Sequence, residues 1–334
     1  MPSERDRLAG RRAALEARAR VRRAVRDWFE DQGFLEVETP ARVPAPGQEP
    51  HLDAIAAGAG SGPGDHRWLA TSPEYHMKRL CAAGYQRIVQ IGKAFRGGER
   101  GPHHQSEFAI IEWYRAGAPL ETLARDCEQL LREAARAAGR DPAALGLAEA
   151  FERTTVRALL LRHAGIELRG DESAPELRAK AIAARAFAGA PPPEDAAWDD
   201  VFFQVFLDRV EPQLGRGRPT LVFDWPAPLG ALARRHPDDP RLVERFELYA
   251  GGLELANAFG ELTDAGEQRA RFIAESGLRA ARGKAVYPLD ENLLAALPLM
   301  PPTAGIALGF DRLVMLVLGA TDIREVVAFA DDEV

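Results

Sequence analysis

Residues 246–262 constrain the fold more than any other stretch, because two runs of alternating apolar and polar side chains flank the pair Gly251-Gly252. Two consecutive glycines between such runs are typical of a two-residue β-turn, in which both central residues need positive φ. The sequence therefore predicts two antiparallel strands, 246–250 and 253–262, joined by a tight turn.

Two glutamates flank this turn. A two-residue turn pairs Tyr249 with Glu254. It also pairs Glu247 with Ala256, which makes Glu247 and Glu254 diagonal neighbours roughly 7 Å apart. Two carboxylates this close favour a cation between them, and oxygen ligands without His or Cys suit Mg²⁺. The alternative is a pair of solvated glutamates on an exposed sheet face.

Asn257, Phe259 and Glu261 alternate along the second strand, so their side chains share one face. Glu254 has the opposite parity and would face the other way in a regular strand. A β-bulge between Glu254 and Asn257 is therefore required if all four side chains are to reach one pocket.

A second pair of strand-like runs spans 87–96 and 107–114, with the Gly-rich loop 97–104 between them. Strand alternation places four side chains of the second run on one face: Phe108, Ile110, Glu112 and Tyr114. Arg96 ends the first run, where its guanidinium can bind a phosphate through two parallel hydrogen bonds. A single arginine at a strand end is more often a solvated charge. The loop is suited to close over a ligand, and its adjacent histidines lack the spacing of a zinc site.

Residues 305–309 form a run of small and apolar side chains that leads directly into an apolar helix at 310–318. Small side chains leave room beside the backbone for a flat ligand. Arg312, in the first turn of that helix, adds a full charge to an anion-binding helix terminus. The alternative is close packing of strand on helix, with Asp311 and Arg312 on the surface.

The remaining pattern mixes helices and strands. It predicts helices at 11–31 and 120–138, strands at 34–40 and 220–225, an exposed loop at 44–66 whose glycines at 58–62 form a flexible connection, and a mainly helical segment at 145–215. Strands separated by helical segments indicate an α+β fold, an antiparallel sheet flanked by helices. We expect a single domain over residues 1–334, with a helical insertion at about 145–215.

Composition excludes several classes of protein. No run approaches the ~18 apolar residues of a membrane span. The two cysteines, Cys81 and Cys127, are too few for a disulfide framework, so a reducing, cytoplasmic environment is expected. The formal net charge of −7 does not suit a general nucleic-acid binder, which needs a basic face.

Several segments, in order, resemble the catalytic domain of class II lysyl-tRNA synthetases and, more closely, the truncated paralogues that ligate lysine to elongation factor P. The resemblance extends from about residue 11 to the C-terminus. It rests on Glu-Val-Glu-Thr-Pro at 36–40, Thr-Ser-Pro-Glu-Tyr-His-Met-Lys-Arg-Leu at 71–80, Phe-Arg at 95–96, Glu-Phe at 107–108, Glu-Trp-Tyr at 112–114, Glu-Leu-Ala-Asn-Ala-Phe-Gly-Glu-Leu-Thr-Asp at 254–264, and the third motif at 305–312.

This resemblance implies a class II aminoacyl-tRNA-synthetase-like fold, a homodimer formed through the first motif, and ATP-dependent adenylation of a lysine-like acid. By matching position, Arg96 and Arg312 would be catalytic, on the α- and γ-phosphates. The implied ATP site comprises Arg96, Glu99, His104, Phe108, Glu247, Glu254 and Arg312, with Mg²⁺ held by Glu247 and Glu254. The implied substrate site comprises Ser72, Glu74, Glu112, Tyr114, Asn257, Phe259, Glu261 and Ala307.

The resemblance also bears on the acceptor. Lysyl-tRNA synthetases carry an N-terminal anticodon-binding OB-fold, and we expect none here because few residues precede the predicted helix 11–31. Ser72 and Ala307 follow the ligase pattern, and one methyl group in a packed pocket can shift preference toward a differently shaped lysine. The resemblance thus implies transfer of (R)-β-lysine, or lysine, to a lysine ε-amine of elongation factor P, without tRNA or a membrane. A minimal lysyl-tRNA synthetase and a catalytically impaired amino-acid sensor are the alternatives.

The second motif departs from the family. The usual Arg-Asn-Glu reads Arg96-Gly97-Gly98, and the usual His-Asn-Pro-Glu-Phe reads His-Gln-Ser-Glu-Phe at 104–108. Glu99 can take the place of the missing glutamate, but the glycine before it leaves its position less fixed. The departure affects the expected recognition of adenine by the loop, and it implies slower adenylation, a changed acceptor or an inactive paralogue. It does not affect the predicted fold.

Overall fold

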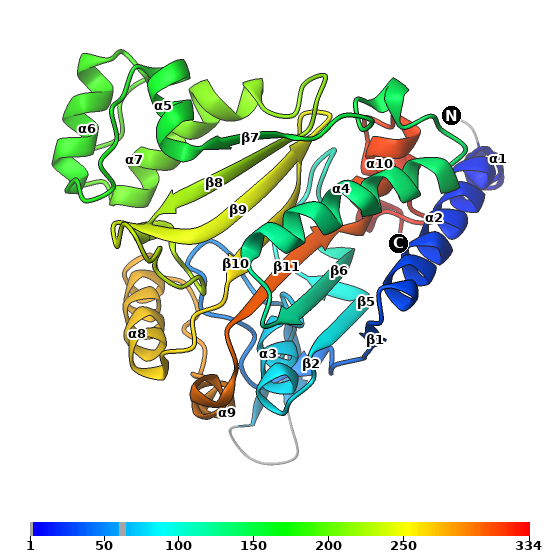
Figure 1. Cartoon of the computed structure of the whole chain (residues 1–334), viewed down its shortest axis with the longest axis horizontal. Coiled ribbons are helices and arrows are strands. Elements are labelled where there is room, and N and C mark those ends of the chain that lie inside the picture. Colours follow the sequence, from blue (N-terminus) through cyan, green and yellow to red (C-terminus); the bar gives the residue numbers. More distant parts are fainter. Residues whose placement is uncertain (1–2, 60–64) are drawn as a thin grey trace.

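The computed structural model describes residues 3–59 and 65–334; residues 60–64, which include part of the predicted flexible glycine stretch, lie outside the described residues. An eight-stranded sheet runs through the molecule in the order β1-β5-β6-β11-β10-β9-β8-β7 (Figure 1). In that order the strands are β1 (Leu35–Glu36), β5 (Arg87–Phe95), β6 (Glu107–Ala116), β11 (Thr303–Gly309), β10 (Leu253–Gly260), β9 (Leu242–Ala250), β8 (Thr220–Pro226) and β7 (Glu152–Thr155). A small second sheet contains β2 (Arg42–Val43), β4 (His66–Leu69) and β3 (Ala56–Ala59).

The predicted α+β class is confirmed, and the pairings in the middle of the large sheet are antiparallel. The two edges differ from the prediction, because β1 pairs with β5 and β7 pairs with β8 in parallel. Parallel neighbours need a long crossover connection. Both edge pairs have one: residues 37–86 separate β1 from β5, and the helical segment separates β7 from β8.

The hairpin of β9 and β10 forms around Gly251 and Gly252, whose φ angles of 62° and 76° are the positive values that the tight turn needs. Glu254 pairs with Tyr249, as predicted. The register then shifts between Glu254 and Ala256, so the predicted bulge is confirmed. The bulge also corrects one pairing, because Glu247 lies opposite Asn257 rather than Ala256.

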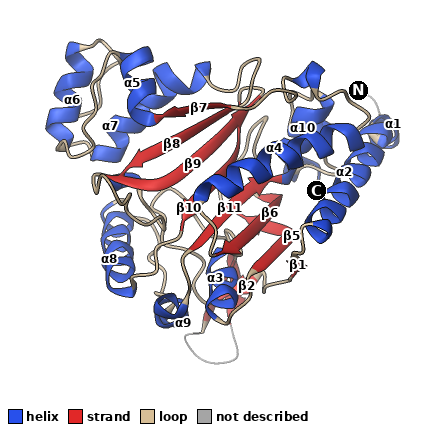
Figure 2. Ribbon diagram, viewed as in Figure 1, coloured by secondary structure: helices blue, strands red, loops and turns tan. Residues whose placement is uncertain are grey.

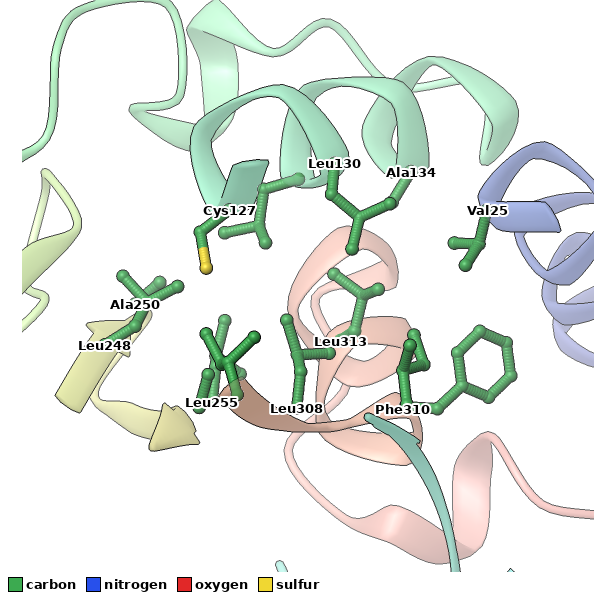
Figure 3. Close-up of a cluster of buried hydrophobic side chains, with 14 of the residues drawn as sticks. Val25, Cys127, Leu130, Ala134, Leu248, Ala250, Leu255, Leu308, Phe310 and Leu313 are labelled. Atoms are coloured by element: carbon green, nitrogen blue, oxygen red, sulfur yellow. The ribbon is translucent and has the colours of Figure 1, made fainter. Parts of the chain in front are cut away.

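The main hydrophobic core lies on one face of the sheet. Its helices are α2 (Arg12–Asp31), α4 (Leu120–Ala137) and α10 (Phe310–Leu318), which cover that face (Figure 2). In Figure 3, Cys127 and Leu130 of α4 lie above Leu255 and Leu308 of the sheet. Leu255 and Ala256 are consecutive, yet both belong to this core, because the bulge turns them to the same side. Asn257 and the residues that alternate with it then face the opposite side.

Two smaller clusters complete the packing. The helices α5 (Val156–Ala164), α6 (Ala174–Ala183) and α7 (Trp198–Val205) pack beside β8 and β9, in the segment predicted to be mainly helical, which also contributes β7. The helices α3 (Glu74–Ala82), α8 (Ala265–Ala281) and α9 (Glu291–Ala296) pack near β6 around Tyr114. A short helix, α1 (Glu4–Gly10), precedes α2.

The described part of residues 44–66 differs from the predicted exposed loop. Residues 45–48 are buried, and β3 lies within the segment. The Gln48 amide donates hydrogen bonds to the carbonyl oxygens of Tyr287 and Pro288, so this proline- and glycine-rich segment is anchored to the chain that follows α8. Both cysteines are free and buried. Among the described residues, no helix is long and apolar enough to cross a bilayer.

Candidate functional site

A cavity of about 670 Å³ lies on the face of the sheet opposite the main core. Strands β6, β10 and β11 form one wall, and α3, α7, α8 and the loop 97–104 surround it. The predicted site residues that line it are Ser72, Glu74, Arg96, Glu99, His104, Phe108, Glu112, Tyr114, Glu254, Asn257, Phe259, Glu261, Ala307 and Arg312. Glu247 is the one predicted site residue outside this lining.

The deepest charged groups come from α3 and from the residue that follows β10. The Lys78 ammonium lies 2.6 Å from Glu74 Oε1 and 2.6 Å from Glu261 Oε2, and the side chains of Lys78 and Glu261 are almost fully buried. Burial alone would lower the pKa of Lys78, but the two carboxylates raise it, so the ammonium stays charged. Burial raises the pKa of Glu261, and Lys78 opposes that rise.

Glu112 of β6 supplies a third buried carboxyl group. The Tyr114 hydroxyl donates a hydrogen bond to Glu112 Oε2 at 3.4 Å, while Glu112 Oε1 has no hydrogen-bond partner. Burial, together with the nearby Glu74 carboxylate, raises the pKa of Glu112 to about 8, while Ser72 and Arg96 oppose the rise. We call Glu74, Glu112 and Glu261 the acidic floor. Buried carboxyl groups with so few partners fit a ligand that itself carries positively charged groups.

Strand β11 leaves space for these side chains. A side chain at Gly305 would overlap both Glu261 Oε1 and the Tyr114 ring, so only glycine fits at this position. Ala307 follows two residues later and lines the same cavity. The predicted run of small residues therefore forms the wall against which the acidic floor packs.

The other end of the cavity is rich in arginine. Arg96, which follows β5, lies over the Phe108 ring with 5.0 Å to the centroid, and its Nη1 is 3.8 Å from Glu99 Oε1. Arg96 Nε also donates to the Thr71 carbonyl oxygen at 3.4 Å. The guanidinium and the ring are thus together at one wall, where a phosphate and a flat ring can be bound side by side.

Arg312 connects the loop 97–104 to the hairpin. It donates to the carbonyl oxygens of His103 (3.3 Å) and Glu254 (2.7 Å) and to His104 Nε2 (2.5 Å). Burial and the Arg312 charge lower the pKa of His104 to about 4, so the imidazole is neutral and accepts this bond. Asp311 is buried, against the alternative of a surface position, and pairs with Arg18 at 2.5 Å.

The predicted magnesium pair is only partly brought together. Glu254 lines the cavity, whereas Glu247 lies behind it, where Oε1 accepts from Arg245 (2.5 Å) and Oε2 from the Tyr249 hydroxyl (2.6 Å). Burial raises the pKa of Glu247 to about 7, with Arg245 opposing and Glu254 adding to the rise. Each carboxylate oxygen keeps a second lone pair. The donor set therefore fits a hard cation that is bound mainly by phosphates. Among the described residues no group of three or more His, Cys, Asp or Glu is placed to hold a metal.

Sequence reasoning missed two charged residues of the site. Lys78 follows Glu74 by four residues, a spacing that places both on one face of a helix and that signals an ion pair. Arg245 precedes Glu247 by two residues, so alternation puts both on one face of β9. Arg245 also donates to Asn257 Oδ1 at 3.1 Å, and so it connects the two strands of the hairpin.

The departures in the second motif have structural partners. Gly97 N donates to the Asp53 carbonyl oxygen at 2.6 Å, and a side chain at Gly97 would come within 3.2 Å of that oxygen. Gln105 Oε1 accepts from Asp331 N (2.7 Å), and Ser106 N donates to Asp331 Oδ2 (2.8 Å). These residues attach the loop to residues 49–53 and to the C-terminal turn.

The chain is similar to known proteins over nearly its whole length. The family model for class II tRNA synthetases (D, K and N) matches residues 7–333. Two proteins named elongation factor P–(R)-β-lysine ligase, from Klebsiella pneumoniae strain 342 and from Klebsiella pneumoniae subsp. pneumoniae, are each 41% identical to this chain over 320 residues. The alignments cover 94% of this chain and 94% of each relative.

Proposed function

The chain belongs to the class II tRNA synthetase family (D, K and N), and on this premise we propose that it is an ATP-dependent ligase that transfers (R)-β-lysine, or lysine, to a lysine ε-amine of elongation factor P. The single observation that carries the proposal is the acidic floor in a cavity that Arg96 and Arg312 also line. The 41% identity to two ligases of that name supports this choice of substrate and acceptor.

The acidic floor accounts for the amino-acid substrate. A lysine-like acid carries two ammonium groups, and buried carboxylates reject neutral and anionic side chains, which would leave them unpaired. Each ammonium–carboxylate contact near 4 Å is worth about 4 kcal/mol before the cost of desolvation. Glu74, at the start of α3, suits the amino group near the substrate carboxylate, and Glu112 and Glu261 suit the distal one.

The arginines account for activation. With ATP on Phe108, Arg96 neutralises the α-phosphate while the substrate carboxylate attacks the phosphorus, and Arg312 holds the leaving pyrophosphate. Mg²⁺, if held by Glu254 with Glu247 behind it, would add positive charge to the phosphates. The ε-amine of the acceptor then attacks the acyl carbon, an amide bond forms, and AMP leaves. We further propose a cytoplasmic homodimer, which light scattering of the purified chain tests.

Mass spectrometry of the acceptor tests the proposal. Purified elongation factor P is incubated with ATP, Mg²⁺, (R)-β-lysine and the enzyme. The expected result is a mass increase of one lysyl group on a single lysine, absent without ATP. Robust charging of total tRNA with radiolabelled lysine, and an unmodified factor, would instead identify a minimal tRNA synthetase.

Two observations favour a catalytically impaired sensor. Gly97 and Gly98 replace the polar residues usual for the family, and the Arg312 guanidinium already donates a hydrogen bond to His104. ATP–pyrophosphate exchange separates the two readings, because a sensor binds the amino acid without exchange whereas a ligase exchanges pyrophosphate when lysine or β-lysine is present.

A further inference from the structure

Lys78 forms ion pairs with two of the three glutamates of the acidic floor, Glu74 and Glu261. Its side chain is fully buried, and its ammonium divides between Glu74 Oε1 and Glu261 Oε2, 2.6 Å from each. Lys78 does not pair with the second oxygen of either carboxylate, Glu74 Oε2 or Glu261 Oε1, so these two oxygens can bind other groups. Glu261 Oε1 lies against Gly305, a lining residue of the cavity.

The charges of these groups can be counted. Once the three carboxyl groups of the floor are all ionised, they and the one ammonium leave the floor with two net negative charges, which equals the two positive charges of a diamino acid's ammonium groups. Without Lys78, a third carboxylate would remain uncompensated when such a substrate binds. An uncompensated buried charge is expensive, so the floor would hold an extra proton instead.

We propose that Lys78 is a specificity-determining residue, which fixes the charge of the acidic floor at the value that two ammonium groups neutralise and which holds Glu74 and Glu261 at one separation. The inference rests on the proposed function for the identity of the substrate. The positions of the charged groups come from the structure and do not depend on that function. Lys78 itself is a positioning residue, because it acts on substrate through the two glutamates.

Other titratable groups also surround Lys78. Those that face it or its two partners are Tyr75 and Cys81 on α3, Glu112 and Tyr114 on β6, Glu275 on α8, Glu49 in the segment before β3, and Arg234, which faces Glu261. The one other cation in this set, Arg234, is paired with Glu244. Removal of Lys78 therefore leaves its two carboxylates with no close replacement.

A ligand-free titration is the first test. Infrared spectroscopy of the whole enzyme follows protonation of buried carboxyl groups in the wild type and in Lys78→Met. We expect the titration to move upward by about one pH unit or more, since an opposite charge this close shifts a carboxyl pKa by 1–3 units. Lys93→Met is the matched control, because Lys93 pairs with Glu107 on the exposed side of β5 and should change nothing. An unchanged titration in Lys78→Met would overturn the proposal.

Substrate binding is the second test. In ATP–pyrophosphate exchange, Lys78→Met should raise the KM for lysine or β-lysine about tenfold or more at pH 7, leave the KM for ATP unchanged, and move the pH midpoint of KM upward. Calorimetric binding of the same amino acids gives the midpoint even if the enzyme shows no exchange. Absence of exchange in the wild type would therefore contradict the proposed function, whereas an unmoved midpoint would contradict the role of Lys78.

A compensated variant covers the case in which Lys78→Met does not fold. Lys78→Met combined with Glu74→Gln removes one charge of each sign and keeps the floor at two negative charges. We expect its pH midpoint within half a unit of wild type, although its KM stays raised. If the pH midpoint of KM in this double variant is displaced by a full unit or more, Lys78 does not act by balancing the charge of the floor.

Discussion

At the scale of single residues, the acidic floor makes substrate binding depend on pH. Burial raises the pKa of Glu112 to about 8, so below that pH the empty cavity holds a proton that an incoming ammonium must displace. Affinity for the diamino acid should fall about tenfold per pH unit for each proton displaced as the pH drops from 8 to 6. Exchange kinetics measured at several pH values check this. The variant Glu112→Gln, which has no proton to release, is the control and should lose this dependence; the KM for ATP is not a control here, because Glu247, with a pKa of about 7, titrates in the same range.

Two substitutions should affect the binding of the amino acid and the binding of ATP separately. Glu261→Gln removes a buried partner of the substrate ammonium, and we expect the KM for the amino acid to rise about ten- to hundredfold while ATP binding is spared. Arg312→Ala should do the reverse and raise the KM for ATP most. Glu107→Gln, at an exposed glutamate, is the control. Equal loss of ATP affinity in Glu261→Gln would contradict the assignment of the pocket.

The residues that sequence reasoning missed share a physical cause. Lys78 and Arg245 bind no substrate atom by themselves in this reading, and their importance lies in the carboxylates that they hold. A lysine or arginine near a glutamate is usually a solvated surface pair. Only the fold, which brings Glu261 from beyond β10 to Lys78 of α3, distinguishes a buried pair from an exposed one.

At the scale of elements, β11 acts as a flat wall because Gly305 has no side chain. Gly305→Ala would push against Glu261 Oε1 and the Tyr114 ring, and we expect at least a tenfold rise in the KM for the amino acid with a smaller effect on ATP. Gly277→Ala in α8 is the matched control, since its new methyl group meets nothing within 4 Å. Melting curves first confirm that both variants fold, and their KM values for the amino acid are then compared. An unaltered KM in Gly305→Ala would contradict the placement of Tyr114 and Glu261.

The hairpin was predictable down to its irregularity, because side-chain parity is a local property. Opposite parity of Glu254 and Asn257 requires a bulge if both face one cavity, and the register shift is there. The parallel edges were not predictable in this way, since each depends on where a long connection returns to the sheet. Burial of residues 45–48 likewise depends on distant partners, such as the carbonyl oxygens of Tyr287 and Pro288.

At the scale of the whole molecule, the buried carboxyl groups of the cavity oppose folding at alkaline pH. Burial raises the pKa values of Glu112 and Glu275 to about 8, above the usual glutamate value of 4.5, so both bind protons more tightly in the folded state. Their contribution to stability is complete below pH 4.5 and is lost as the pH rises through 8. Glu172 and Glu333, with pKa values of about 2, change stability only in acid.

Thermal melting measures this contribution. Without substrates, the melting temperature should fall between pH 6 and pH 8.5, and saturating lysine or β-lysine should remove most of the slope, because bound ammonium groups stabilise the carboxylates. The double variant Glu112→Gln, Glu275→Gln should show a flatter curve than wild type. A melting temperature that rises over this range would mean that these groups are ionised and paired in the empty enzyme.

The contact of Gln105 and Ser106 with Asp331 has a practical consequence. The loop that adjoins Arg312 is attached to the last turn of the chain, close to the terminal Val334. A change at Asp331 would therefore reach that loop, and through it the nucleotide end of the cavity. Every ATP titration of this protein should accordingly be made with Asp331 unaltered.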